Sequence, residues 1–219
     1  MSQARSLAGT LGMTILLLRH HDFRTMTRVI LILAGPTQWD DEDRLVGNHP
    51  LPLTDAARAA ISGVIEHLPQ RVTSVYRASK NEACDQVAKM VASHFKIRAR
   101  ESAALDEVDL GLWEGLTRAE LTFRFPSVFP EWEESPLAVN PPDGEPLPEA
   151  IERIRGGLRG ILRRNRGVTI ALPLRPMAMQ IALGILRREN PEAIAAHLHN
   201  SSPVETIEIA DNDLYQFIA

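Results

Sequence analysis

The sequence has only one cysteine, Cys84, no excess of positive charge and no long apolar run. A single cysteine excludes an intrachain disulfide framework and favours a reducing compartment, so we expect a cytoplasmic protein. Lysine and arginine number 24 against 28 aspartates and glutamates, which gives a net charge of −4. That balance provides no general attraction for nucleic acid or for an anionic membrane, so we expect neither as a partner.

The longest apolar stretch near the amino terminus, residues 7–18, contains glycine and threonine. It is shorter than the roughly 20 residues that a membrane-spanning helix requires. Arg19, His20 and His21 follow it, where a signal peptide would carry small residues before its cleavage site. We therefore expect residues 1–26 to be a weakly specified extension, and residues 27–219 to form the folded domain.

Short β-branched apolar runs alternate with amphipathic segments along this domain. The runs predict strands at 29–33, 72–76, 97–99 and 168–172, and a closing hairpin at 204–209 and 214–218. The amphipathic segments predict helices after Thr54 and at about 80–95, 149–164 and 176–188. Such alternation is typical of an α/β fold, here a three-layer α/β/α sandwich with a mostly parallel central sheet.

Two further segments stand out in composition. Seven prolines lie between Phe123 and Pro148, and because proline blocks helix interiors we expect a long irregular loop there. The helix expected at 149–164 and the residues just after it carry a stripe of four arginines. We interpret this stripe as a solvated helix face rather than an anion-binding surface, because the total charge is acidic. The stripe consists of Arg155, Arg159, Arg163 and Arg166.

Three motifs follow one another at a recognisable spacing. The first runs from Leu33-Ala34-Gly35-Pro36-Thr37-Gln38-Trp39 through Arg44 and Gly47 to Pro52-Leu53-Thr54. The second is Leu105-Asp106-Glu107 with Gly111 and Trp113-Glu114-Gly115, and the third is the run from Pro141 to Glu145. This ordered series resembles the histidine phosphatase superfamily, which includes the cofactor-dependent phosphoglycerate mutases. The resemblance implies a phosphoglycerate mutase-like fold.

The same resemblance shows which family residues this chain lacks. In the family an Arg-His pair ends the first strand, and that histidine is the nucleophile; here Leu33 and Ala34 stand in those positions. Ala83 stands at the family's second arginine and Pro173 at its second histidine, while Glu107 keeps the family's residue type. The pocket rim implied by the resemblance consists of Gly35, Thr37, Arg44, Asn48 and Arg175.

These substitutions remove the groups that phosphoryl transfer uses. Alanine has no lone pair to attack phosphorus, and the loss of a nucleophile alone can cost about 10⁶ in rate. Leu33 and Ala83 replace two guanidinium groups, each suited to bidentate phosphate binding. We therefore expect a neutral or slightly acidic pocket without metal or cofactor. The chain is then a non-catalytic binding or regulatory module for a small molecule or protein, or a structural partner such as one half of a homodimer.

An active phosphomonoesterase or mutase with relocated catalytic groups is the alternative. Arg19-His20 also follows an apolar run, but no glycine and no threonine-tryptophan pair come after it. Arg44 or Arg175 would otherwise supply positive charge, with His49 as a base.

The remaining reactive side chains have plainer interpretations. His197 and His199 have no third metal ligand nearby in the sequence, so we interpret them as a surface pair. Cys84 lies among small apolar residues, and we expect it to be a buried core residue.

Overall fold

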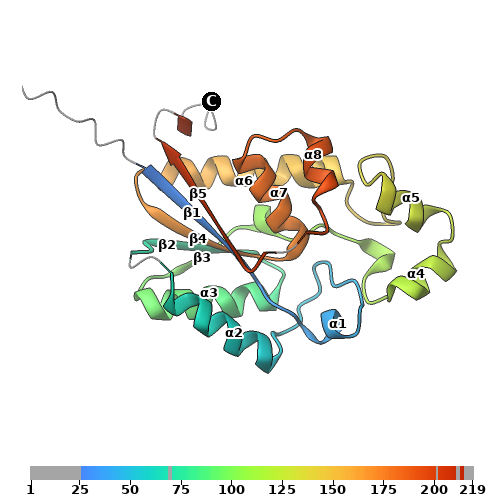
Figure 1. Ribbon diagram of the computed structural model, residues 1–219, viewed down its shortest axis with the longest axis horizontal. Coiled ribbons are helices and arrows are strands. Elements are labelled where there is room, and N and C mark those ends of the chain that lie inside the picture. The colour runs from blue at the N-terminus through green and yellow to red at the C-terminus, as the bar shows by residue number, and fades with distance from the viewer. Residues whose placement is uncertain (1–25, 69–70, 201, 211–212, 215–219) are drawn as a thin grey trace, which may run out of the picture.

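The computed structural model of the protein describes residues 26–68, 71–200, 202–210 and 213–214. At its centre is a five-stranded sheet with the strand order β3-β2-β4-β1-β5 (Figure 1). Strand β5 runs antiparallel to β1, and the other neighbouring pairs are parallel. The mostly parallel sheet is therefore confirmed. The strands are β1 (Met26–Leu33), β2 (Ser74–Arg77), β3 (Ala99–Glu101), β4 (Thr169–Leu174) and β5 (Val204–Ala210).

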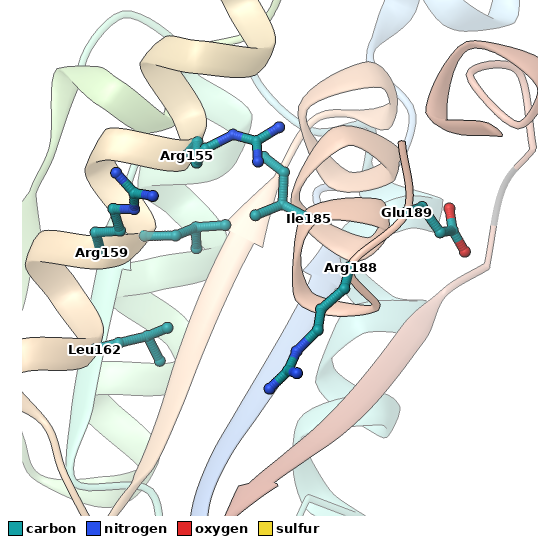
Figure 2. Close-up of a pocket in the computed structure, with 7 residues that line it drawn as sticks. Arg155, Arg159, Leu162, Ile185, Arg188 and Glu189 are labelled. Carbon is teal, nitrogen blue, oxygen red and sulfur yellow. The ribbon is translucent and has the colours of Figure 1, made fainter. Parts of the chain in front are cut away.

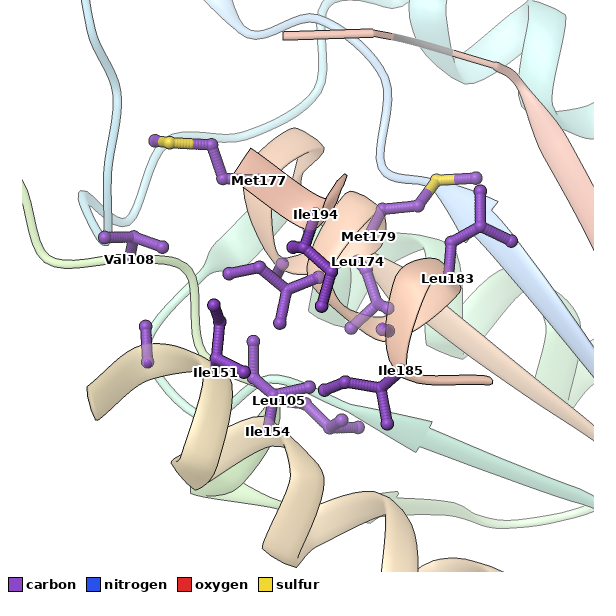
Figure 3. Close-up of a cluster of buried hydrophobic side chains, with 14 of the residues drawn as sticks. Leu105, Val108, Ile151, Ile154, Leu174, Met177, Met179, Leu183, Ile185 and Ile194 are labelled. Atoms are coloured by element: carbon purple, nitrogen blue, oxygen red, sulfur yellow. The ribbon is translucent and has the colours of Figure 1, made fainter. Parts of the chain in front are cut away.

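Helices cover both faces of this sheet (Figure 1). Since successive strand residues point to opposite faces, Ile30 and Ile32 pack into the core formed with α2 and α3, whereas Val29 and Leu31 join the core formed with α6 and α7. Figure 3 shows this second core, in which Ile154 and Ile185 meet between the helices. The helices are α2 (Asp55–Glu66), α3 (Glu82–Phe95), α6 (Leu147–Arg164), α7 (Pro176–Leu186) and α8 (Pro191–Ala196).

The start of each helix on the α2–α3 face is fixed by a capping side chain. Thr54 accepts a hydrogen bond from the backbone N–H of Ala57 at 3.2 Å, as its position before the apolar pattern predicts. Asn81 does the same for Cys84 at 3.1 Å and starts α3. These caps determine where the two helices leave the edge of the sheet at which β1 and β2 end.

The prediction of one irregular loop from Phe123 to Pro148 is wrong at both ends. The last two residues of α4 (Arg118–Arg124) and all of α5 (Val128–Glu134) lie in its first part, and α6 begins at Leu147. Pro130 and Pro148 fit because both lie in the first turn of a helix, where backbone N–H groups have no partner within the helix. Prolines at these positions therefore start helices rather than break them.

Strand β4 is longer than its apolar run predicts. It continues through Pro173 to Leu174, so the helix that follows begins at Pro176 and Pro173 is a strand residue. The carbonyl of Leu174 accepts from the N–H of Ala34, the residue directly after β1, so the nitrogen of Pro173 faces the opposite side, toward β2. The β2–β4 register ends at Val75 opposite Ala171, and the missing N–H of Pro173 thus removes no bond from that ladder.

The predicted carboxyl-terminal hairpin does not form within the described residues. Strand β5 pairs with β1 instead, and Leu214 lies in a helical turn; residues 215–218 lie outside the described part of the chain. Residues 1–25, which include Arg19 and His20, also lie outside it. In the part that is described, none of the helices combines the length and apolar character needed to cross a bilayer.

Candidate functional site

The candidate site lies at the carboxyl ends of β1 and β4, the edge at which open α/β sheets bind ligands. Leu33 is the register partner of Leu174, and the N–H of Ala34 donates to the carbonyl of Leu174 at 2.8 Å. Ala34 is completely buried. The two strands therefore end in aliphatic residues at the floor of the site.

A pocket of about 270 Å³ opens beside these strand ends; we call it the strand-end pocket. Trp132 from α5, Met177 from α7 and Leu198 after α8 contribute apolar surface to it. Its charged and titratable lining residues are Asp40, Arg44, Glu107, Arg118, Arg175 and His199.

Arg175 is buried in the floor of this pocket and not at its rim, where the sequence places it. Its side chain is 3% exposed and folds back from the start of α7 onto the loop after β1. Nη1 donates to the carbonyls of Ala34 and Gly35 at 3.0 and 3.1 Å, and Nη2 lies 2.6 Å from Oδ1 of Asp40. The guanidinium group is thus directed at oxygens of the chain itself.

Asp40 is held in place by the short helix α1 (Gln38–Asp41). Its Oδ2 accepts hydrogen bonds from the backbone N–H and the hydroxyl of Thr37, both at 2.7 Å, which forms a capping box. Thr37 is fully buried. Thr37 therefore orients the carboxylate that neutralises Arg175, rather than presenting its hydroxyl to a ligand.

The side chain of Glu107 lies against the amino terminus of α7. Its Oε1 accepts from the N–H groups of Val108 and Ala178, both at 2.8 Å, and its Oε2 accepts from Met177 at 3.0 Å. The side chain is buried, and this burial raises the pKa of Glu107 despite the three hydrogen bonds. Free N–H groups in the first turn of a helix form the usual binding site for an anion, and here a carboxyl group of the chain already uses two of them.

The other two arginines of the pocket are also paired with acids. Nε of Arg44 lies 2.9 Å from Oε2 of Glu42, and Nη1 lies 3.2 Å from Oε2 of Glu120. Nη1 also donates to the carbonyl of Gly115. Arg118 forms an ion pair with Glu133. Every guanidinium group that lines the strand-end pocket therefore has a carboxylate partner.

Asn48 lies on the other side of Glu107. Its backbone N–H donates to Glu114 at 3.0 Å and its amide Nδ2 donates to the carbonyl of Glu107 at 2.9 Å, while its buried Oδ1 has no partner. It lines a second hollow of about 460 Å³, which shares Glu107 with the strand-end pocket. Acids outnumber bases in that lining: Asp106, Asp109, Asp143, Glu145 and Glu149 stand with Glu107 against Lys80 and Arg153.

The remaining residues named from the sequence lie apart from the pocket lining. His49 stacks on Trp39 with ring centroids 4.5 Å apart and faces solvent. Ala83 and Cys84 are completely buried in α3, and burial raises the pKa of the Cys84 thiol to about 12. Among the described residues, no group of three histidine, cysteine or acidic side chains is arranged to hold a metal ion.

His199 is a pocket residue that the sequence does not reveal. It lies after α8 at the mouth of the strand-end pocket, with its ring against Trp132 at a centroid distance of 5.6 Å. Partial burial, and secondarily the charge of Arg118, lower its pKa. His197 instead contacts Asn200, so the two histidines have different surroundings. Only the fold brings His199 beside α5, because no short-range spacing links these segments.

The chain belongs to the histidine phosphatase superfamily (branch 1), whose sequence model matches residues 29–214. The resemblance drawn from the motifs is confirmed at this level. The five-stranded, mostly parallel sheet with helices on both faces agrees with the α/β fold that the resemblance implies.

Sequence relatives of the chain are distant. It is 26% identical over 165 residues to "Bifunctional protein Rv2228c" of Mycobacterium tuberculosis, which covers 74% of this chain and 45% of that protein. It is 22% identical over 157 residues to "Phosphoserine phosphatase 1" of Hydrogenobacter thermophilus, covering 69% and 74%. The chain thus spans less than half the length of its mycobacterial relatives.

Solved structures with the same fold include two with a TM-score of 0.73. Bacillus stearothermophilus YhfR is 22% identical, with 84% of this chain and 92% of that chain covered. The alpha-ribazole phosphatase from Shigella flexneri is 19% identical, with 84% and 91% covered. At this identity the two structures establish the fold of the chain.

Proposed function

We propose that this protein is a non-catalytic member of the superfamily, which uses the strand-end pocket to bind an uncharged, partly apolar ligand. One observation carries the proposal. Most of the cationic and N–H donors beside the ends of β1 and β4 are already bonded to the chain: both Nη atoms of Arg175 bind chain oxygens, including Asp40, and the first turn of α7 binds Glu107. In the described part of the chain Nε of Arg175 has no partner, but it is buried.

We expect a phosphate dianion to bind weakly in such a pocket. To bind Arg175 it must displace Asp40, and charge-assisted hydrogen bonds of this kind contribute about 1.5–3 kcal/mol each. To reach the start of α7 it must displace Glu107, and it then lies beside a carboxyl group. Ala34 offers no nucleophile in the family's position. The apolar walls from Trp132, Met177 and Leu198 favour a neutral molecule instead.

Hydrolysis of phosphomonoesters by the purified full chain tests this proposal. We expect p-nitrophenyl phosphate, phosphoserine and 3-phosphoglycerate to be hydrolysed at the rate measured without protein, whereas an active superfamily member measured in parallel turns them over. The proposal fails if turnover co-purifies with the chain and disappears in Arg175→Gln or His199→Asn.

A relocated catalytic site is the second candidate, and the position of His199 favours it. An imidazole shares the strand-end pocket with Arg44 and Arg118, so a base and two cations lie around one hollow. Both arginines are engaged by acids, and this argues against strong phosphate binding. Turnover that is lost in His199→Asn but retained in His197→Asn would establish this candidate in place of the first.

A further inference from the structure

A second concave surface lies between α6 and α7, away from the strand-end pocket, and we call it the α6–α7 groove. It has a volume of about 230 Å³, and its floor is formed by Leu158, Leu162 and Ile185. These three side chains are at most 4% exposed and belong to the larger core. Polar contacts to a molecule in the groove must therefore come from its walls.

Arginines form those walls. Figure 2 shows Arg155 reaching from α6 toward Ile185 of α7, with Arg159 one turn further along α6. Arg188 extends from the residues just after α7, and Glu189 is turned to the far side of that helix end (Figure 2). Side chains four residues apart are neighbours on a helix surface. Two guanidinium groups of α6 are thus placed to share one ligand.

The two guanidinium groups on α6 are only weakly neutralised by the chain. Nε of Arg155 lies 3.3 Å from Oε1 of Glu152, whose side chain is 72% exposed. This Nε atom is buried and makes no hydrogen bond. Exposed pairs of this kind contribute little, because water screens the two charges. For Arg159, no hydrogen bond or ion pair is formed with any residue the structure describes. Arg188 forms an ion pair with Asp213, with Nη2 and Oδ1 3.7 Å apart.

We propose that the α6–α7 groove binds a small organic dianion, a phosphate monoester or a dicarboxylate, between Arg155 and Arg159, with Arg188 as the third cation. Guanidinium forks match the paired oxygens of both anions. An apolar floor lowers the local dielectric response and strengthens these contacts relative to open solvent. A hollow of about 230 Å³ suits a small molecule better than a macromolecular surface.

This site differs in charge from the strand-end pocket. There all three arginines have carboxylate partners, whereas in the groove Arg159 has none among the described residues and one glutamate lines the site beside three arginines. The inference also revises the interpretation of the arginine stripe on α6: Arg155 and Arg159 line the groove, and Arg163 does not. Arg163 is exposed on the same helix and therefore serves as a matched control.

Isothermal titration calorimetry of the full chain tests the proposal, with glycerol phosphate and succinate as probes at pH 7.5 and low salt. We expect one-to-one saturable binding that weakens as salt is added, because the contacts are electrostatic. Arg159→Gln should weaken it at least tenfold, and Arg155→Gln combined with Arg159→Gln should abolish it. Arg163→Gln should leave it within twofold of the wild type.

Four outcomes would overturn the proposal. The first is no saturable binding of either probe, and the second is an equal loss in Arg163→Gln, which indicates a diffuse surface effect. The third is binding to vesicles containing phosphatidic acid but to neither soluble probe, which assigns the arginines to a lipid surface. The fourth is binding that survives in the double variant, which would place the anion elsewhere and would also count against the proposed function. Failure at the groove alone leaves that function standing.

Discussion

Nη2 of Arg175 lies 2.6 Å from Oδ1 of Asp40, across 135 residues of sequence. The pair joins the residue that follows β4 to the short helix that follows β1, and the same guanidinium group binds the carbonyls of Ala34 and Gly35. It therefore links the ends of β1 and β4 at the floor of the strand-end pocket, and its contribution to the free energy of unfolding can be measured.

Removal of the negative charge at Asp40 should destabilise the protein. In Asp40→Asn the buried Arg175 loses its only carboxylate partner among the described residues, and leaving a buried charged donor in this state costs about 1–3 kcal/mol. The free energy of unfolding, from urea titration followed by tryptophan fluorescence, measures the loss. Asp41→Asn is the matched control, because Asp41 is the exposed next residue of α1. Equal stability of the two variants would contradict a role for the pair.

Glu107 should make the stability depend on pH. Burial raises its pKa above the usual 4.5, so the folded protein keeps a proton that the unfolded chain has released. The unfolded state then binds fewer protons, and the free energy of unfolding should fall as the pH rises from about 4.5 through the folded pKa.

Glu107→Gln should remove this pH dependence. It should also lower the free energy of unfolding by about 1–3 kcal/mol, because an NH2 group replaces one of the two oxygens and cannot accept a hydrogen bond from α7. Urea titrations at several pH values measure both effects. Glu66→Gln, at an exposed position of α2, should reproduce neither. A wild-type curve and a Glu107→Gln curve that remain parallel across this pH range would argue against the assignment.

Cys84 should be unreactive in the folded protein. It is completely buried in α3, and burial raises its pKa to about 12, so at pH 8 only about one thiol in 10⁴ is the reactive thiolate. Labelling by Ellman's reagent should therefore proceed at the rate at which the protein opens, and should become fast in 6 M guanidinium chloride. Rapid stoichiometric labelling without denaturant would show that the α3 core is accessible.

His199 should titrate below 6.5, because burial and then the charge of Arg118 lower its pKa. The imidazole is neutral in the folded state while the unfolded chain takes up a proton, so this residue lowers stability as the pH falls below about 6.5. Proton NMR of the imidazole measures the pKa directly. Arg118→Gln should raise it, whereas Arg124→Gln, an exposed residue of the same helix, should not. A titration unaffected by Arg118→Gln would remove His199 from the neighbourhood of that arginine.

Much of the fold follows from local patterns in the sequence. The apolar runs predict the four parallel strands, and Thr54 marks the start of α2 because its side chain caps the helix. Helix α5 is not predicted because prolines dominate the local signal there. What stabilises α5 is long-range: Phe129 and Trp132 pack against Trp113 with ring centroids 5.5 and 5.3 Å apart. Such aromatic contacts between distant segments leave no trace in periodicity.

The candidate site was predictable in part. The motifs identify the strand end at Leu33 and Ala34, and they single out Glu107. They do not show that Glu107 binds the first turn of α7 or that Arg175 turns inward, because both depend on contacts between segments at least 70 residues apart. For the same reason Arg118 and His199, which come together only through the arrangement of α4 and the segment after α8, were not recognised as pocket residues.

Because Arg175 points inward, the base and the outer wall of the strand-end pocket have different roles. Its base contains the buried Arg175, which ties together the ends of β1 and β4, whereas its outer wall includes the exposed residues His199 and Asn200 after α8. Selectivity for the proposed ligand would then depend on these exposed residues rather than on the buried base. Substitutions confined to His199 and Asn200, which are both exposed, should accordingly change what the pocket accepts before they change how the chain folds.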